Sequence, residues 1–223
     1  MKSFSYKFTL FCMLALLAFT SCKKGYLSGG SLHNPVTPLS NMDYLKANSF
    51  KLFDTVTQVI EKFNLASEVN GAKTFFAFTD YSVVNLLNAK LALRQQVNPL
   101  AVYTLDSLYR EITADSIRQY MINEPIELAS ASELKVAPYL SLGKTTMGAV
   151  KQLQTGPPYT DRTKAPTYLL YFVKVRGALD EPGVTPPVNE NDIAVLCQTT
   201  GIKTSNGSTI LHVLSNGHTF VRF

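Results

Sequence analysis

The chain has 223 residues, of which 46% are hydrophobic and 17% are charged, and its formal net charge is +5. Its basic residues are scattered, without the stripe or interleaved aromatic residues of nucleic-acid binders, so the charge pattern gives no support for nucleic-acid binding. The length left after an N-terminal export segment is normal for one domain with a full core.

Residues 1–22 are predicted to be an export signal. Two lysines precede an apolar run over residues 8–19, which is too short to cross a bilayer comfortably. The run ends in small residues before Cys22, and this resembles a bacterial lipobox, in which the peptidase cuts before the cysteine and its sulfur carries diacylglycerol. The resemblance implies a membrane anchor through lipid on Cys22. The alternative is an ordinary signal peptide in which this cysteine is incidental.

Residues 23–40 are rich in glycine, serine and proline and show no apolar period. This composition predicts a flexible tether that holds the folded part away from a membrane. Together with the lipobox resemblance, it predicts an exported protein anchored by lipid in the bacterial envelope, at the outer membrane, on its periplasmic or cell-surface face.

Helices are expected at the start of the domain. Ser40 or Asn41 can cap a short turn, and Asn48 can cap a longer helix whose apolar residues recur at spacings of three and four. These apolar residues are Phe50, Phe53, Val56, Ile60 and Phe63. We interpret them as a core face, because an apolar stripe at helical spacing usually packs. Asn70-Gly71 then predicts a turn into the next strand.

The apolar run over residues 74–78 is too short for a helix and predicts a strand buried on both faces. Thr79 and Asp80 follow it, and each can turn a side-chain oxygen onto the free amides of a first helical turn. The next apolar residues are Val83, Val84, Leu86, Leu87 and Leu91. One buried strand is therefore expected to run straight into one amphipathic helix, with Asp80 in a structural role.

Two further helices are predicted after a break at Asn98-Pro99, within residues 95–104. Their apolar residues are Leu105, Leu108 and Ile112 in the first, and Ile117, Tyr120 and Met121 in the second, which begins at Thr113.

From residue 126 the sequence becomes typical of β-structure. The predicted strands are residues 140–147, 150–153, 167–175 and 193–197. Residues 156–166 and 179–191 are rich in proline, which lacks an amide donor, so both are expected to be exposed loops. Asn206-Gly207 lies between two β-type runs and predicts a final hairpin.

Two stretches of the chain resemble the motifs of the fasciclin (FAS1) domain family. The first motif is a strand that closes on a Thr-Asp pair opening a helix, and it is matched by Phe76, Ala77, Thr79 and Asp80. The second is an Ile, a short polar run, Asn-Gly and an apolar-His-apolar strand, matched by Ile202, Ser205, Asn206, Gly207, His212 and Val213. The resemblance covers residues 41–223 and implies one α+β domain, with a β core that forms a wedge or partly open barrel and helices packed on it.

The chain departs from the family pattern in several places. Phe78 replaces the proline usual after the Phe-Ala pair, Val83 replaces a later aromatic residue, and Ser208-Thr209 resembles a small insertion. The family's Tyr-His pair reads here as Tyr120-Met121, so the cell-adhesion role tied to that region in animal members is not carried over.

No catalytic constellation is found in the sequence. The motifs G-x-S-x-G, G-x-x-x-x-G-K-[ST], H-E-x-x-H and C-x-x-C are all absent. His33 lies in the tether, whereas His212 and His218 share the terminal hairpin. Because its neighbours are apolar, His212 is interpreted as a hydrogen-bonded core residue rather than a metal ligand or base. We therefore expect no catalytic residue, metal or cofactor.

The remaining polar candidates are also interpreted as structural. The nearest carboxylate groups for acid/base chemistry are Glu124 with Glu127, and Glu181 with Glu190 and Asp192. All lie beside prolines in polar loops, which favours solvated surface. Cys197 has apolar neighbours and no disulfide partner in the domain, so it is expected to be a small buried side chain rather than a nucleophile.

One loop is the candidate partner site. Tyr159, Arg162 and Lys164 give residues 156–166 an aromatic ring and two cations, which suit a sugar face or an acidic protein patch. The plain alternative is a surface connection without a partner.

The resemblance implies a non-catalytic binding or adhesion module at the cell envelope, with protein or glycan partners. Two alternatives stay open. One is a structural accessory subunit of an outer-membrane complex, and the other is an envelope hydrolase that uses Asp80 or His212. The sequence determines neither the ligand nor the oligomeric state.

Overall fold

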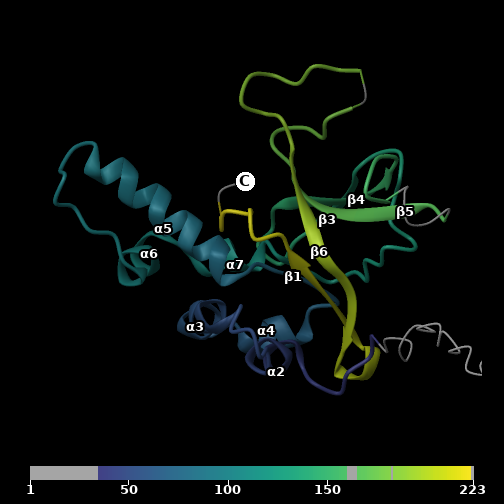
Figure 1. Cartoon of the computed structure of the whole chain (residues 1–223), viewed down its shortest axis with the longest axis horizontal. Helices are drawn as coiled ribbons and strands as arrows, with labels where there is room; N and C mark the ends of the chain where they lie inside the picture. Colours follow the sequence, from purple (N-terminus) through teal and green to yellow (C-terminus); the bar gives the residue numbers. More distant parts are fainter. Residues whose placement is uncertain (1–34, 160–164, 182, 222–223) are drawn as a thin grey trace, which may run out of the picture. The chain divides into compact units, whose positions relative to one another are not determined.

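The structure is a computed structural model that describes residues 35–159, 165–181 and 183–221. The compact unit Pro35–Phe223 combines helices with one seven-stranded sheet (Figure 1). The helices are α2 (Asn41–Lys46), α3 (Asp54–Lys62), α4 (Ala66–Gly71), α5 (Asp80–Gln95), α6 (Leu105–Glu111) and α7 (Ala114–Arg118). The strands are β1 (Thr74–Ala77), β2 (Met121–Ile122), β3 (Ala137–Leu140), β4 (Thr146–Gln154), β5 (Thr167–Lys174), β6 (Ile193–Thr204) and β7 (Thr209–Leu214).

The sheet is mixed and curls into a nearly closed barrel. Its strand order is β2-β1-β7-β6-β5-β4-β3, and all neighbours are antiparallel except β1 and β7. Its two ends meet where Ile122 bridges Ser141 and the Leu142 amide donates to the Met121 carbonyl at 2.9 Å. The barrel is therefore closed by a single β-bridge and one hydrogen bond rather than by a continuous ladder of strand pairing. The predicted α+β class with a partly open barrel core and packed helices is therefore confirmed.

The strand β1 lies between β2 and β7, and all of its residues are buried. Its ladder with β7 pairs Phe76 with His212 and Ala77 with Val213 in parallel register. The Phe76 ring stacks on Phe172 of β5 with ring centroids 4.2 Å apart. The prediction of a strand buried on both faces is confirmed, and the two stretches that resemble the fasciclin motifs lie side by side.

The first helices follow the predicted order but not the predicted caps. Ser40 caps α2 as expected, whereas α3 begins only after Phe53. Asn48 caps a turn instead, because its Oδ1 accepts the Phe50 amide at 3.1 Å, and Lys51 then takes a positive φ that interrupts the helical path. Phe50 is consequently 80% exposed, and its assignment to the core face is wrong.

Asn70-Gly71 does not form the predicted turn. Both residues belong to α4, and Asn70 Oδ1 accepts the Met42 amide of α2 at 2.9 Å. The tertiary hydrogen bond to the first turn of α2 holds Asn70 in a helix, against the local preference of the dipeptide for a turn.

The three later helices begin in the same way. Each has a threonine N-cap with a serine three residues later in a capping box: Thr79 with Ser82, Thr104 with Ser107, and Thr113 with Ser116. The predicted α5, α6 and α7 are confirmed, but α7 ends at Arg118. Tyr120 follows it in a turn and Met121 enters β2, where it pairs with Phe75.

The predicted strand over residues 140–147 is wrong. Only Leu140 lies in β3, and Thr146 and Met147 lie in β4. Between them Ser141 Oγ donates to the Thr145 carbonyl at 2.9 Å, and Lys144 has a positive φ. The segment is therefore a hairpin with a tight turn in its middle.

Residues 35–40 belong to the compact unit, although their composition predicted that they are part of the tether. The Thr37 amide donates to the Lys203 carbonyl at 2.8 Å, and the Lys203 amide donates to the Pro35 carbonyl at 2.7 Å. The segment thus lies along the end of β6 as a short parallel bridge at Val36.

The final hairpin forms as predicted. Asn206 and Gly207 lie in the short 3-10 turn η1 (Ser205–Gly207) between β6 and β7, with positive φ values of 56° and 92°. Asparagine and glycine tolerate this left-handed backbone better than other residues, which explains the strength of the sequence signal. None of the helices among the described residues has the length and hydropathy that a membrane span needs.

Replacing Phe76 by alanine should lower the free energy of unfolding by about 3–5 kcal/mol, because it empties a fully buried ring site against Phe172 and His212. Phe50→Ala is the matched control, and at 80% exposure it should change that free energy by less than about 0.5 kcal/mol. Urea unfolding of the two variants measures both values. Equal losses would contradict the assignment of β1 as the central strand.

Candidate functional site

His212 is buried and fully engaged in the core. Its Nε2 lies 2.8 Å from the Ile126 carbonyl, and its Nδ1 accepts the Gly201 amide at 3.3 Å. Nδ1 can accept only when it carries no proton, so the ring is neutral with its proton on Nε2. Burial lowers its pKa to about 4, which agrees with that form. The predicted hydrogen-bonded core histidine is confirmed.

Tyr120 and His218 form a second buried polar pair. Tyr120 Oη lies 2.8 Å from His218 Nε2 and accepts the Val221 amide at 3.1 Å. The Phe220 ring stacks on Phe78, with ring centroids 4.3 Å apart. Burial lowers the pKa of His218 to about 4. This pair fastens the C-terminal segment to the barrel.

Asp80 joins two helices. Its carboxylate oxygens accept the Thr55 amide at 3.1 Å and the Val56 amide at 2.9 Å, and its own amide donates to the Leu52 carbonyl. These two acceptor bonds satisfy free N–H groups in the first turn of α3, which has no side-chain cap of its own. Asp80 therefore accepts backbone hydrogens as expected, but it caps α3 instead of α5.

Two of the carboxylates weighed in the sequence, those of Glu127 and Asp192, lie in structural contacts, and the Cys197 thiol lies in the core. Glu127 pairs with Lys203 at 2.9 Å, and Asp192 accepts the Arg176 and Asp180 amides. Cys197 is buried as predicted, and burial raises the pKa of its thiol. Among residues 35–159, 165–181 and 183–221, no group of three or more His, Cys, Asp or Glu side chains could hold a metal ion.

The candidate partner loop is only partly described. Tyr159 is 36% exposed, whereas Arg162 and Lys164 lie outside the described residues, as does Cys22. The second proline-rich connection is irregular as predicted, and a cavity of about 320 Å³ there is lined by residues between Ala178 and Glu190.

A different element carries the largest group of exposed apolar side chains among the described residues. The helices α5 and α6 and their connection, residues 96–104, extend away from the sheet (Figure 1). We call residues 80–111 the arm. Four aliphatic side chains near its far end are at least half exposed: Leu93 at 50%, Val97 at 90%, Leu100 at 89% and Val102 at 75%. Single exposed aliphatic residues are common, but a group of this size usually marks an interaction site.

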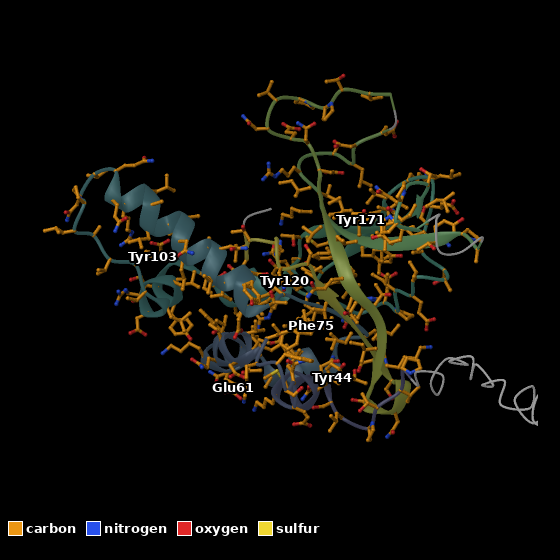
Figure 2. The ribbon with its side chains drawn as sticks, viewed as in Figure 1. Tyr44, Glu61, Phe75, Tyr103, Tyr120 and Tyr171 are labelled. Carbon is orange, nitrogen blue, oxygen red and sulfur yellow. The ribbon has the colours of Figure 1, made fainter. Side chains whose placement is uncertain are left out.

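A network of charged and aromatic side chains braces the arm. Glu111 of α6 contacts two cations of α5, with Lys90 Nζ at 2.8 Å and Arg94 Nη2 at 2.6 Å. The Arg94 guanidinium lies over the Tyr103 ring, 4.7 Å from its centroid, and Figure 2 shows Tyr103 in the arm. Burial raises the pKa of the Tyr103 phenol to about 12, and hydrogen bonding to Lys90 lowers the pKa of Glu111. The network thus holds the two helices together beneath the exposed aliphatic residues.

An open cavity of about 530 Å³ lies along this arm. It is lined by Lys90, Leu93, Arg94, Val97, Asn98, Ala101 and Glu111. Three of its seven lining residues, Leu93, Val97 and Ala101, are aliphatic, and its three charged residues are those of the bracing network. This combination suits recognition by apolar contact with a few oriented charges.

Sequence reasoning missed these aliphatic residues. Leu93 continues the apolar pattern of α5, and Val84, which was assigned to the core face, is exposed. The break at Asn98-Pro99 was the available signal. Residues beyond it cannot continue the helix, so the apolar period of α5 does not place their side chains in the core.

Comparison with known proteins adds no relative. No family model matches the sequence, and no curated protein is significantly similar to it.

Replacing Asp80 by alanine should lower the free energy of unfolding by about 0.5–2 kcal/mol, because the first turn of α3 loses its cap. Asp80→Asn keeps one of the two side-chain acceptors and should retain part of the stability. Urea unfolding of both variants measures this difference. Unchanged stability of Asp80→Ala would show that the capping contact is unimportant.

The stability should fall as the pH is lowered from about 6.5 towards about 4. In this range the unfolded chain protonates His212 and His218, because the ordinary pKa of histidine is 6.5, while the folded chain keeps both neutral. Each histidine should contribute a slope of roughly 1.4 kcal/mol per pH unit. His218→Gln retains a polar group beside Tyr120 and should remove one of the two contributions. Urea unfolding at several pH values compares the slopes, and equal slopes for variant and native chain would contradict the assignment.

Proposed function

We propose that this chain is a non-catalytic binding module of the bacterial envelope, with a fasciclin-like domain that binds a protein partner through the aliphatic end of the arm. The observation that carries the proposal is the exposure of Leu93, Val97, Leu100 and Val102 on a helical hairpin that is braced by Lys90, Arg94 and Glu111. A rigid support makes such exposure favourable for binding, because little conformational entropy is lost when a partner docks.

The fasciclin-like assignment is supported by where the motif residues lie. Phe76 and His212 pair across β1 and β7, Asp80 links two helices, and Asn206-Gly207 form the final turn. Residues chosen for sequence resemblance alone thus occupy connected structural positions.

The anchor is part of the same proposal. Twelve residues, 23–34, separate Cys22 from the compact unit, and an extended chain of that length spans at most about 40 Å. A lipid on Cys22 would therefore keep the arm within reach of other envelope proteins. Mass spectrometry of the purified native protein tests the anchor, and an unmodified Cys22 thiol would contradict it.

Leu100→Ser should weaken partner binding by about tenfold, because a buried aliphatic contact at an interface contributes on the order of 1–2 kcal/mol. The melting temperature should stay nearly unchanged, since the side chain is 89% exposed in the free domain. The measurement is chemical cross-linking in envelope preparations, with the captured protein identified and its binding titrated.

Leu134→Ser is the matched control, because Leu134 is 90% exposed but lies outside the arm. It should leave both binding and melting temperature unchanged. Equal capture by the two variants would remove the arm from consideration and return attention to Tyr159 and its loop.

A further inference from the structure

We propose that the partner docks on the arm as an amphipathic α-helix with an aliphatic stripe and acidic residues beside it. This inference rests on the proposed function of the arm and specifies the chemistry of the partner. It depends on three features of the cavity along α5: its ridge of side chains, its excess of cations over carboxylates, and the absence of aspartate and glutamate from the chain between Asp80 and Asp106.

The cavity follows one face of a helix. Lys90, Leu93 and Arg94 of α5 line it together with Val97 of the turn that follows, at positions i, i+3, i+4 and i+7. Side chains at this spacing form a ridge, and another helix packs on such a ridge by placing its own side chains in the adjacent grooves. The aliphatic members, Leu93 and Val97, are 50% and 90% exposed, so a helical partner has apolar area to cover.

The charges of the cavity favour an acidic partner. Two cations, Lys90 and Arg94, share one carboxylate, that of Glu111. An ammonium has three donors and a guanidinium five, so both cations retain N–H groups beyond those facing Glu111. Their side chains are 39% and 48% exposed, and a carboxylate on the partner could reach them.

The sequence around the cavity strengthens this preference. Between Asp80 and Asp106 the chain contains Lys90 and Arg94 but no aspartate or glutamate. A partner helix with acidic flanks would therefore meet no like charge from α5 or from the connection to α6. A basic partner would face both cations without compensation except from Glu111.

The same charges disfavour a second copy of this chain. A two-fold contact through the cavity would bring together two copies of the same net-positive surface, each with two cations and one carboxylate, and like net charges in an interface are costly. A bilayer is disfavoured as well, because the four exposed residues at the far end are aliphatic, without the aromatic residues typical of membrane interfaces.

The test uses two stapled helical peptides with the same leucine stripe, one flanked by glutamate and the other by lysine. Each is titrated by fluorescence anisotropy against the full chain in lipid nanodiscs, with empty nanodiscs as the blank. The glutamate peptide should bind at least about tenfold more tightly, and added salt should reduce that preference. Equal affinities would overturn the charge preference, and absence of binding by both would overturn the helical partner. Either result would leave the cross-linking test with Leu100→Ser to decide the proposed function separately.

Two variants separate recognition from bracing. Arg94→Gln removes a cation from the cavity and should weaken binding of the glutamate peptide, whereas Glu111→Gln removes the competing carboxylate and should strengthen it. Both variants break the same contact between Arg94 and Glu111. Weaker binding by both would therefore indicate a purely bracing role and overturn the proposal.

The two other possible occupants of the arm, a bilayer and a second copy of this chain, give distinct results. A fluorophore attached at Leu100→Cys reports contact with lipid when nitroxide-labelled lipids are included in the nanodiscs. Quenching that the glutamate peptide does not relieve would assign the arm to the bilayer. Sedimentation of the full chain in detergent reports self-association, and a dimer lost in Leu100→Ser would assign the arm to a second copy. Both outcomes would overturn the helical partner.

Discussion

The structure depends on one aromatic stack at the centre of the barrel. Phe76 of β1 lies against Phe172 of β5 and against His212 of β7, with ring centroids 4.2 and 5.0 Å away. The histidine ring is held in this position by both of its nitrogens, one bonded to the Ile126 carbonyl and the other to the Gly201 amide. The stack thus connects strands that are distant in sequence. The two hydrogen bonds of His212 fix the orientation of its ring against Phe76.

The Gly201 contact explains an irregularity of β6. The pairing of β6 with β7 shifts register between Thr199 and Ile202, and Gly201 has a φ of 74° at that point. A residue with a side chain is strained in this left-handed conformation, whereas glycine adopts it readily. The bulge turns the Gly201 amide towards His212 Nδ1, so the distortion of the strand satisfies a buried acceptor.

The arm combines a firmly held base with an exposed far end. At its base, Asn85 Nδ2 donates to the Asn216 and His218 carbonyls, and Thr79 Oγ1 donates to Asn216 Oδ1. Only the first half of α5 contributes buried residues, namely Ser82, Val83 and Leu86. The second half is held to α6 by the charged network, and α6 itself packs into the core through Leu108. The aliphatic side chains beyond that network do not reach the core, which leaves them exposed.

The sequence alone determined those features whose signals are local. A run of apolar residues predicted β1, Thr79 and Thr113 predicted the starts of two helices, and Asn206-Gly207 predicted the final turn, because strand burial, capping and left-handed turns each depend on a few neighbouring residues. Tertiary structure decided the rest. Asp80 caps a helix that begins 26 residues earlier, and Asn70 stays helical through a hydrogen bond to α2. The aliphatic residues of the arm are exposed because the end of α5 extends beyond the core. Each of these features depends on which distant segments come into contact in the folded chain. The spacing of residues along the sequence does not specify those contacts.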